Sequence, residues 1–227
     1  MNYAFPPAPQ PHIVIANSND RFPVRRIYCV GQNYLAHVLE MGSDPSKPPF
    51  FFTKPADAVV ADGSDVAYAS ETENLHYEAE LVVAIGTGGA NITETDALNH
   101  VWGYATGIDL TRRDLQTAAK NAGKPWDMAK GFDNSAPCGA LHPVAEVGHV
   151  DSGHIRLSVN GEMRQDSDLS DMIWSVPAII ATLSRFVTLA PGDLIYTGTP
   201  SGVGPVVAGD RLKVEIEGLS DLTVSIT

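Results

Sequence analysis

The chain has 227 residues, which suits one large domain or at most two small ones. Hydrophobic residues make up 44% and charged residues 19% of it, a composition that excludes a disordered chain. The formal net charge of −12 argues against a nucleic-acid partner, because phosphate contacts need clustered Lys and Arg side chains.

The sequence also bears on location. No apolar run approaches the ~20 residues of a membrane span, and the opening stretch MNYAFPPAPQPHIVIAN lacks the basic and apolar regions of a signal peptide. Cys29 and Cys138 have apolar or small neighbours and belong to no CxxC pair, so we expect reduced structural thiols. We therefore expect a cytoplasmic protein with no membrane and no nucleic-acid partner.

The predicted strands are many and short. Residues 1–20 are proline-rich and predict an extended N-terminal arm, which leaves 21–227 as a single domain. Apolar and β-branched runs then predict strands at RRIYCVG (25–31), FFFTKP (50–55), ELVVAIG (80–86), VWGYATGIDL (101–110), IRLSVNG (155–161), DLIYTG (193–198), RLKVEIEG (211–218) and DLTVSIT (221–227).

The predicted helices are few. NYLAHVLEMG (33–42) predicts a short helix that ends at Gly42. A second helix is predicted over 111–123, with Thr111 and Asp114 at capping-box spacing, and a third over 175–186, with Ser175 as N-cap and Pro177 in the first turn. Strands do not alternate regularly with helices, so the pattern favours an α+β domain with a mixed, curled β structure.

Two glutamates open the apolar stretch LHYEAELVVAIG. On a strand, Glu78 and Glu80 would project from the same face, where two like charges repel unless a proton or a cation lies between them. Taken alone, the stretch is more typical of a strand whose glutamates face water. The alternative is a buried pair that holds a cation.

A third acid closes the predicted strand 101–110. Asp109 stands just before a predicted helix, where an acid often serves only as a cap. If Asp109 lies beside Glu78 and Glu80, the three carboxylates with water would form a hard oxygen site suited to Mg²⁺ or Mn²⁺.

Two pairs of polar residues share helix faces. His37 and Glu40 are three apart, and a histidine oriented by a carboxylate is the usual form of a general base. A surface pair explains that spacing equally well. Arg113 and Gln116 are also three apart, just after Asp109.

Two further features are open to more than one interpretation. Lys130, in MAKGF, follows a short loop and is unremarkable alone. The glycine-rich TGTPSGVGP (197–205) carries no GK[ST] motif, so it is either a nest of backbone N–H groups for an anion or a tight surface loop. The chain has no G-x-S-x-G motif, so the sequence gives no indication of covalent catalysis.

The order of longer motifs resembles the fumarylacetoacetate hydrolase family. The resemblance runs from about Arg25 to the C-terminus and is carried by RIYCVGQNYLAHVLEMG, PPFFFTKPADAVV, HYEAELVVAIG, GYATGIDLTRRDLQ, KPWDMAKGFDNSAPCG and SVNGEMRQDSDLSDMIWSVPAIIATLSRFVTLAPGDLIYTGTPSGVGPV. It implies the mixed β-sandwich or roll of the family's C-terminal domain, with few short helices, and a homodimer.

The resemblance also implies the centre of the site. One divalent cation per subunit, Mg²⁺ or Mn²⁺, would be held by Glu78, Glu80 and Asp109. His37 and Glu40 would form a dyad that activates water, carried on a lid over the substrate.

The remaining implied residues contact the substrate. Gln116 and Lys130 match positions that stabilise a developing oxyanion, and Arg113 and Thr199 match substrate-binding positions. Gln32 stands where the resemblance leads us to expect Arg, a difference that bears on lid contacts or substrate preference.

The implied reaction is metal-dependent hydrolysis of a carbon–carbon bond in an acylpyruvate. The substrate is a small dicarboxylate diketo acid, first of all fumarylpyruvate, split to fumarate and pyruvate in gentisate-type aromatic degradation. Oxaloacetate decarboxylation and keto-acid isomerisation are alternatives within the family, and a non-catalytic β-rich binding protein is an alternative outside it.

Overall fold

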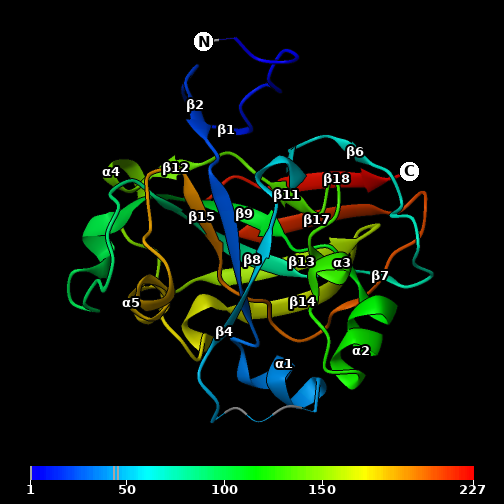
Figure 1. Cartoon of the computed structure of the whole chain (residues 1–227). Coiled ribbons are helices and arrows are strands. Elements are labelled where there is room, and N and C mark those ends of the chain that lie inside the picture. The colour runs from blue at the N-terminus through cyan, green and yellow to red at the C-terminus, as the bar shows by residue number, and fades with distance from the viewer. Residues whose placement is uncertain (1, 43, 45) are drawn as a thin grey trace.

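An eight-stranded mixed sheet runs through the middle of the protein, whose computed structural model describes residues 2–42, 44 and 46–227 (Figure 1). Its central strand, β8 (Ala79–Ile85), is buried along its whole length, because both faces of the sheet are covered. In spatial order the strands are β4 (Phe50–Lys54), β3 (Arg26–Gly31), β15 (Asp193–Tyr196), β8 (Ala79–Ile85), β9 (Val101–Ile108), β11 (Ala136–Cys138) and β5 (Val59–Ala61), with β12 (His142–Pro143) paired to β9.

A five-stranded sheet packs against this one. In β13, β17 and β18, buried residues alternate with partly exposed ones, so one face packs inward and the other meets water. The order of the strands is β14 (Glu162–Asp168), β13 (His154–Val159), β17 (Arg211–Ile216), β18 (Leu222–Ile226) and β6 (Asp65–Val66).

The pleat of β8 divides the core into two clusters. Leu81 and Val83 face the five-stranded sheet and pack with residues such as Ile155. Val82 and Ala84 point to the opposite face and join the second cluster, which also contains the buried free thiols of Cys29 and Cys138.

Two small sheets complete the β structure. One joins β10 (Thr111–Arg112), β7 (Leu75–Tyr77) and β16 (Gly204–Pro205). The other pairs β1 (His12–Val14) with β2 (Arg21–Pro23), near the N-terminus in Figure 1. The division into an arm over 1–20 and a catalytic domain over 21–227 stays a prediction.

The helices are short and lie around the sheets. Figure 1 shows α1 and α2 together beyond one end of β4. The α-helices are α1 (Leu35–Glu40), α2 (Arg113–Asn121), α3 (Asp127–Lys130), α4 (Val144–Val147) and α5 (Val176–Phe186), and the 3-10 helices are η1 (Ala56–Ala58), η2 (Ala97–His100) and η3 (Leu169–Asp171). No helix in the described part of the chain is long and apolar enough to cross a bilayer.

The predicted caps have different outcomes. Ser175 caps α5 as predicted, since its Oγ accepts from the Ala178 N–H. The capping box at α2 is wrong: the helix begins at Arg113 without a side-chain cap, Thr111 lies in β10, and the Asp114 carboxylate accepts from Thr72 instead. Tertiary partners have replaced the local cap.

The α+β fold class is confirmed. All eight predicted strands and the three predicted helices are present, and parallel pairs such as β15 with β3 adjoin antiparallel pairs such as β8 with β9. Short helices and mixed sheets are what the sequence predicts.

Candidate active site

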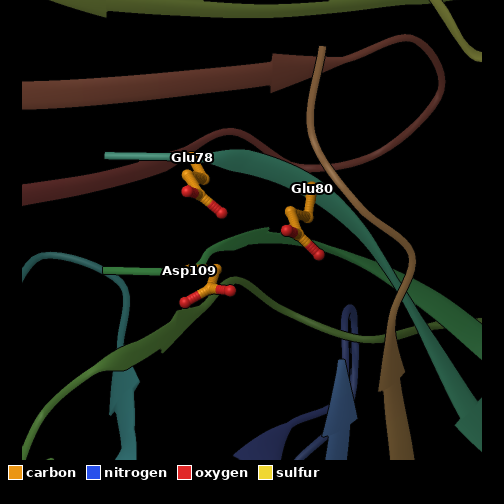
Figure 2. Close-up of side chains that lie close together, drawn as sticks. All are labelled: Glu78, Glu80 and Asp109. Carbon is orange, nitrogen blue, oxygen red and sulfur yellow. The ribbon is translucent and has the colours of Figure 1, made fainter. Parts of the chain in front are cut away.

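Three carboxylates meet where β8 and β9 adjoin. Glu78 lies in the one-residue break between β7 and β8, Glu80 is the second residue of β8, and Asp109 follows the last residue of β9. The antiparallel register places Asp109 opposite Glu78, and the Asp109 N–H donates to the Glu78 carbonyl at 2.8 Å. Each side chain offers an oxygen within 4.8 Å of the others (Figure 2). We call these three residues the acidic triad.

The acidic triad is buried. Glu78 is 5% exposed, Glu80 1% and Asp109 0%, so the interpretation in which the glutamates face water is wrong. Asp109 does not cap α2 either, because its side chain binds ammonium groups in the core. The folded sheet brings these acids beside cationic side chains that are distant in the sequence, so the stretch LHYEAELVVAIG alone does not reveal them.

Lys130 and Arg113 neutralise part of this charge. Lys130 Nζ donates to Glu78 Oε2 and Asp109 Oδ2, each at 2.8 Å, and to Thr111 Oγ1 at 2.6 Å. Arg113 Nη2 donates to the other oxygen of Glu78. Burial lowers the pKa of Lys130, but the charges of Asp109 and Glu78 outweigh it and raise that pKa above its ordinary value.

The pKa values of the two glutamates are shifted in opposite directions. Burial raises the pKa of Glu78, yet the charges of Lys130 and Arg113 outweigh it and hold that pKa well below its ordinary value. Burial also raises the pKa of Glu80, and the charges of Asp109 and Glu78 raise it further. Among the described residues no cationic side chain forms an ion pair with Glu80, so either a proton or a bound cation balances this carboxylate.

Lys54 is a site residue that the sequence analysis did not identify. Its ammonium group is fully buried at the end of β4, 2.8 Å from Asp109 Oδ1, and it donates to the carbonyl oxygens of Leu110 and Lys130. The contact between Lys54 and Asp109 Oδ1 is an ion pair, and Oδ1 accepts no hydrogen bond. In the sequence, Lys54 follows FFFT and resembles an ordinary strand end.

His37 and Glu40 form the predicted pair. On α1, His37 Nδ1 lies 3.0 Å from Glu40 Oε2, and Glu40 Oε1 accepts from the Gly202 N–H at 3.3 Å. The imidazole is buried, while the carboxylate is partly exposed. With Nδ1–H donated to the carboxylate, Nε2 carries the free lone pair.

The glycine-rich loop holds the other side of the acidic triad. Residues 197–200 are buried, so the loop does not begin as a surface turn, and the Gly198 N–H donates to Glu80 Oε2 at 2.8 Å. Gly198 adopts φ +94, and a Cβ there would lie 2.7 Å from the Cβ of Asn33, so only glycine suits this contact. The anionic group that this loop binds is therefore the Glu80 carboxylate of the chain itself.

A cavity of about 240 Å³ joins these groups. The apolar side chains of Met41, Phe50, Phe52 and Trp126 form part of its wall, together with Gln32, which adopts φ +64. The predicted site residues that line it are His37, Glu78, Glu80, Arg113, Gln116, Lys130 and Thr199. Asp109 and Glu40 stand behind the wall and bind residues that line it.

The acidic triad fits a divalent cation. All its ligand atoms are carboxylate oxygens, which Mg²⁺ and Mn²⁺ prefer. Two oxygens bound to one ion at about 2.0–2.6 Å lie at most about 5 Å apart. One oxygen from each carboxylate of the triad lies within 4.8 Å of the other two, so the three can bind one ion. Glu80 is a further feature that a cation would satisfy, because burial and the neighbouring Asp109 and Glu78 raise its pKa and no cationic side chain of the described residues balances it.

Comparison with known proteins gives the family. The model of the fumarylacetoacetate (FAA) hydrolase C-terminal family matches residues 26–227. Fumarylpyruvate hydrolase of Ralstonia sp. is 46% identical over 177 residues, which cover 78% of this chain and 92% of the relative. Oxaloacetate tautomerase of Escherichia coli (strain K12) is 42% identical over 200 residues, which cover 88% and 91%.

A solved structure agrees with these sequences. The crystal structure of fumarylpyruvate hydrolase from Pseudomonas aeruginosa in complex with Mn²⁺ and pyruvate matches with a TM-score of 0.98 and 52% identity, and the match covers 100% of this chain and 99% of that one. The chain belongs to the fumarylacetoacetate hydrolase family. The family resemblance predicted from the motifs is therefore confirmed, as is the fold it implied.

Proposed function

We propose that this protein hydrolyses fumarylpyruvate to fumarate and pyruvate with a divalent cation bound by the acidic triad. The observation that carries the proposal is the convergence on one cavity of two glutamates of the triad, a histidine backed by a carboxylate, a buried ammonium group and a buried guanidinium group. The relatives named fumarylpyruvate hydrolase, at 46% and 52% identity, support the choice of substrate.

The bound cation, Mg²⁺ or Mn²⁺, supplies Lewis acidity toward the carboxylate and 2-oxo oxygens of an acylpyruvate. Arg113 and Thr199 then hold the same end of the substrate. The Arg113 guanidinium is fixed by Glu78 and by Gln116 Oε1, which accepts from Nη1 at 2.5 Å. A guanidinium held on two sides is preorganised to bind a carboxylate.

His37 is the proposed general base. Its Nδ1–H is donated to Glu40, so Nε2 is left to take a proton from water at the cavity wall. Glu40 orients the imidazole and stabilises its cationic form. The water oxygen bonds to the distal acyl carbon, and the bond between this carbon and the pyruvate methylene breaks. The electron pair of that bond passes to the pyruvate carbon, which takes up a proton to become a methyl group.

In this proposal Lys130, through its charge, and Gln116, through an N–H group, stabilise the oxyanion formed by that attack. The raised pKa of Lys130 keeps its ammonium group charged. Gln116 Oε1 is occupied by Arg113, so the Gln116 amide can offer only its N–H groups to the cavity. A fixed charge and a fixed donor favour the charged intermediate without reorganisation.

The charge balance of the site supports a dianionic substrate. When ionised, the acidic triad faces three buried or nearly buried cationic groups, which are Lys54, Lys130 and Arg113. These charges cancel, so a bound dication leaves the site with two positive charges. A substrate with two carboxylates carries the opposite charge and would balance them.

The far end of the cavity suits the second carboxylate. Arg113, Gln116, Thr117 and Lys120 line the cavity from α2 at positions i, i+3, i+4 and i+7, so they share one face. Seven residues at 1.5 Å each place Lys120 about 10 Å from Arg113 along the helix. Fumarylpyruvate, with seven carbons, extends about 7–8 Å between its carboxyl carbons. We propose that Lys120, which is exposed at the mouth, binds the distal carboxylate.

The second candidate is oxaloacetate tautomerisation, favoured by the relative of that name at 42% identity. A panel of acylpyruvates together with oxaloacetate, each assayed with Mn²⁺ and with EDTA, separates the two. We expect metal-dependent cleavage with fumarylpyruvate as the preferred substrate. Turnover of oxaloacetate alone would overturn the proposal. Equal rates with Mn²⁺ and with EDTA would show that the reaction needs no metal ion.

We also propose that the chain acts as a cytoplasmic homodimer in gentisate-type aromatic degradation. Several large apolar side chains are exposed, among them Phe186 at 75% and Met128 at 68%, and a dimer interface would cover such groups. Light scattering at micromolar concentration should give twice the 24.2 kDa of one chain. A mass of one chain would contradict the dimer and leave the proposed reaction untouched.

A further inference from the structure

Gln165, in the middle of β14, is a fully buried amide with three hydrogen bonds. Its Oε1 accepts from the Ala79 N–H at 3.0 Å, and its Nε2 donates to Thr199 Oγ1 at 2.9 Å and to the Pro200 carbonyl at 2.8 Å. We propose that Gln165 is a positioning residue that fixes the Thr199 hydroxyl so that its proton points to the substrate.

The orientation of this amide is decided by its neighbours. A backbone N–H can only donate and a backbone carbonyl can only accept. Ala79 therefore requires the amide oxygen on its side, and Pro200 requires the amide nitrogen on the other. The amide cannot be turned over without opposing both groups, so the group that faces Thr199 is always a donor.

This donor determines what Thr199 can do. A hydroxyl carries one proton, and here the Thr199 oxygen accepts from Gln165 Nε2, so the proton is left for another acceptor. Thr199 is 2% exposed and lines the cavity. The acceptor with the matching chemistry is an anionic oxygen of the ligand, such as the carboxylate that pyruvate and fumarylpyruvate share.

Gln165 also joins the two sides of the site. Ala79 stands between two members of the acidic triad, and Pro200 follows Thr199. One side chain therefore sets the distance between the chain segment of the triad and the hydroxyl that contacts the substrate. The inference rests on the proposed function, because it takes an acylpyruvate or its product as the ligand.

The test is a double-mutant cycle of Gln165→Met and Thr199→Val, read as pyruvate affinity of the Mn²⁺-loaded protein by calorimetry. Losing one hydrogen bond to a charged ligand group should weaken pyruvate binding by about 10- to 100-fold in Thr199→Val. Gln165→Met should weaken it by a smaller factor. In the double variant we expect the loss of Thr199→Val alone, because Gln165 acts only through that hydroxyl.

Two controls separate positioning from general damage. Arg164→Met changes an exposed neighbour on the same strand and should bind pyruvate normally. Thr199→Ser keeps the hydroxyl and should retain its coupling to Gln165. If Gln165→Met does not fold, Gln165→Glu takes its place, since it keeps an acceptor for Ala79 and removes the donor that faces Thr199.

Losses that multiply in the double variant, or parental pyruvate affinity in the Gln165 variant, would overturn the inference. Failure of the proposed function is a different result, because it would appear in the parental protein as no binding of pyruvate and no cleavage of fumarylpyruvate. An active parental protein with an additive cycle would refute only the role of Gln165.

Discussion

Asp109 and Glu78 are held opposite each other by the backbone, because the Asp109 N–H donates to the Glu78 carbonyl at 2.8 Å at the point where β9 leaves β8. The two carboxylates therefore begin from paired positions, and Glu80 joins them from the second position of β8. Strand pairing, rather than the reach of flexible side chains, brings the acidic triad together, and a rigid set of oxygens is what a small divalent cation requires.

The first prediction concerns the metal. Glu80→Gln keeps the shape of the side chain and removes one ligand charge, so Mn²⁺ affinity measured by calorimetry should fall by at least about 100-fold and turnover should be nearly lost. Glu78→Ala and Asp109→Ala should have the same effect. Glu94→Gln changes an exposed glutamate that does not line the cavity and should bind Mn²⁺ normally. Normal Mn²⁺ affinity in all three site variants would refute the metal assignment.

The second prediction separates the base from the metal. His37→Ala should lower kcat for fumarylpyruvate by about 10²–10⁴ and leave Mn²⁺ affinity unchanged, since His37 acts on water and not on the cation. Glu40→Gln should give a milder defect, because the imidazole keeps a hydrogen-bond partner and loses only the charge. His12→Ala, at an exposed histidine, is the control. If His37→Ala hydrolyses fumarylpyruvate at the parental rate across pH 6–9, His37 is not the general base, and His37 and Glu40 are only a structural pair on α1.

The third prediction concerns substrate length. Lys120→Met should raise KM for fumarylpyruvate by about 10-fold, the effect of losing one ion pair or charged hydrogen bond. Any turnover of oxaloacetate should be unaffected, because a four-carbon chain that is bound at the triad does not reach Lys120. Lys124→Met is a matched control, since Lys124 is exposed nearby and does not line the cavity. An equal change in KM for both substrates would show that Lys120 does not distinguish the longer substrate from the shorter one.

The fourth prediction concerns stability. Lys54 and Asp109 form an ion pair whose side chains are both fully buried. Lys54→Met leaves Asp109 with one cation fewer, so the free energy of unfolding should fall by about 3 kcal/mol in urea titrations of the metal-free protein. Lys213→Met breaks exposed pairs with Glu215 and Asp221 and should cost less than about 1 kcal/mol. Equal midpoints for the two variants would refute a structural role for Lys54.

The fold could be predicted because its local patterns agree with the final structure. The apolar run of β8 belongs to a sheet covered on both faces, and the alternation in β17 belongs to a sheet with one wet face. Ser175 caps α5 because its partner is three residues away in the same helix. Each of these features leaves a pattern that a short stretch of the sequence shows.

The site could be predicted only in part, because its partners come from distant segments. Glu78 and Glu80 look like exposed strand residues until β9 brings a third acid and α3 brings Lys130 beside them. Thr111 loses its predicted capping role to a contact with Lys130. Gln165 lies in the polar run RQDSD, where nothing distinguishes a buried amide from its exposed neighbours.

The central claim is that water splits the acylpyruvate, and the most direct test is turnover of fumarylpyruvate by the Mn²⁺-loaded protein in H₂¹⁸O. Hydrolysis places one solvent oxygen in the new carboxylate of fumarate, because the attacking water supplies it. Mass spectrometry of the fumarate at early times should therefore find one ¹⁸O per molecule, with pyruvate released in equal amount. If the substrate only changes its tautomer, or if the fumarate formed contains no ¹⁸O, the hydrolytic account is contradicted.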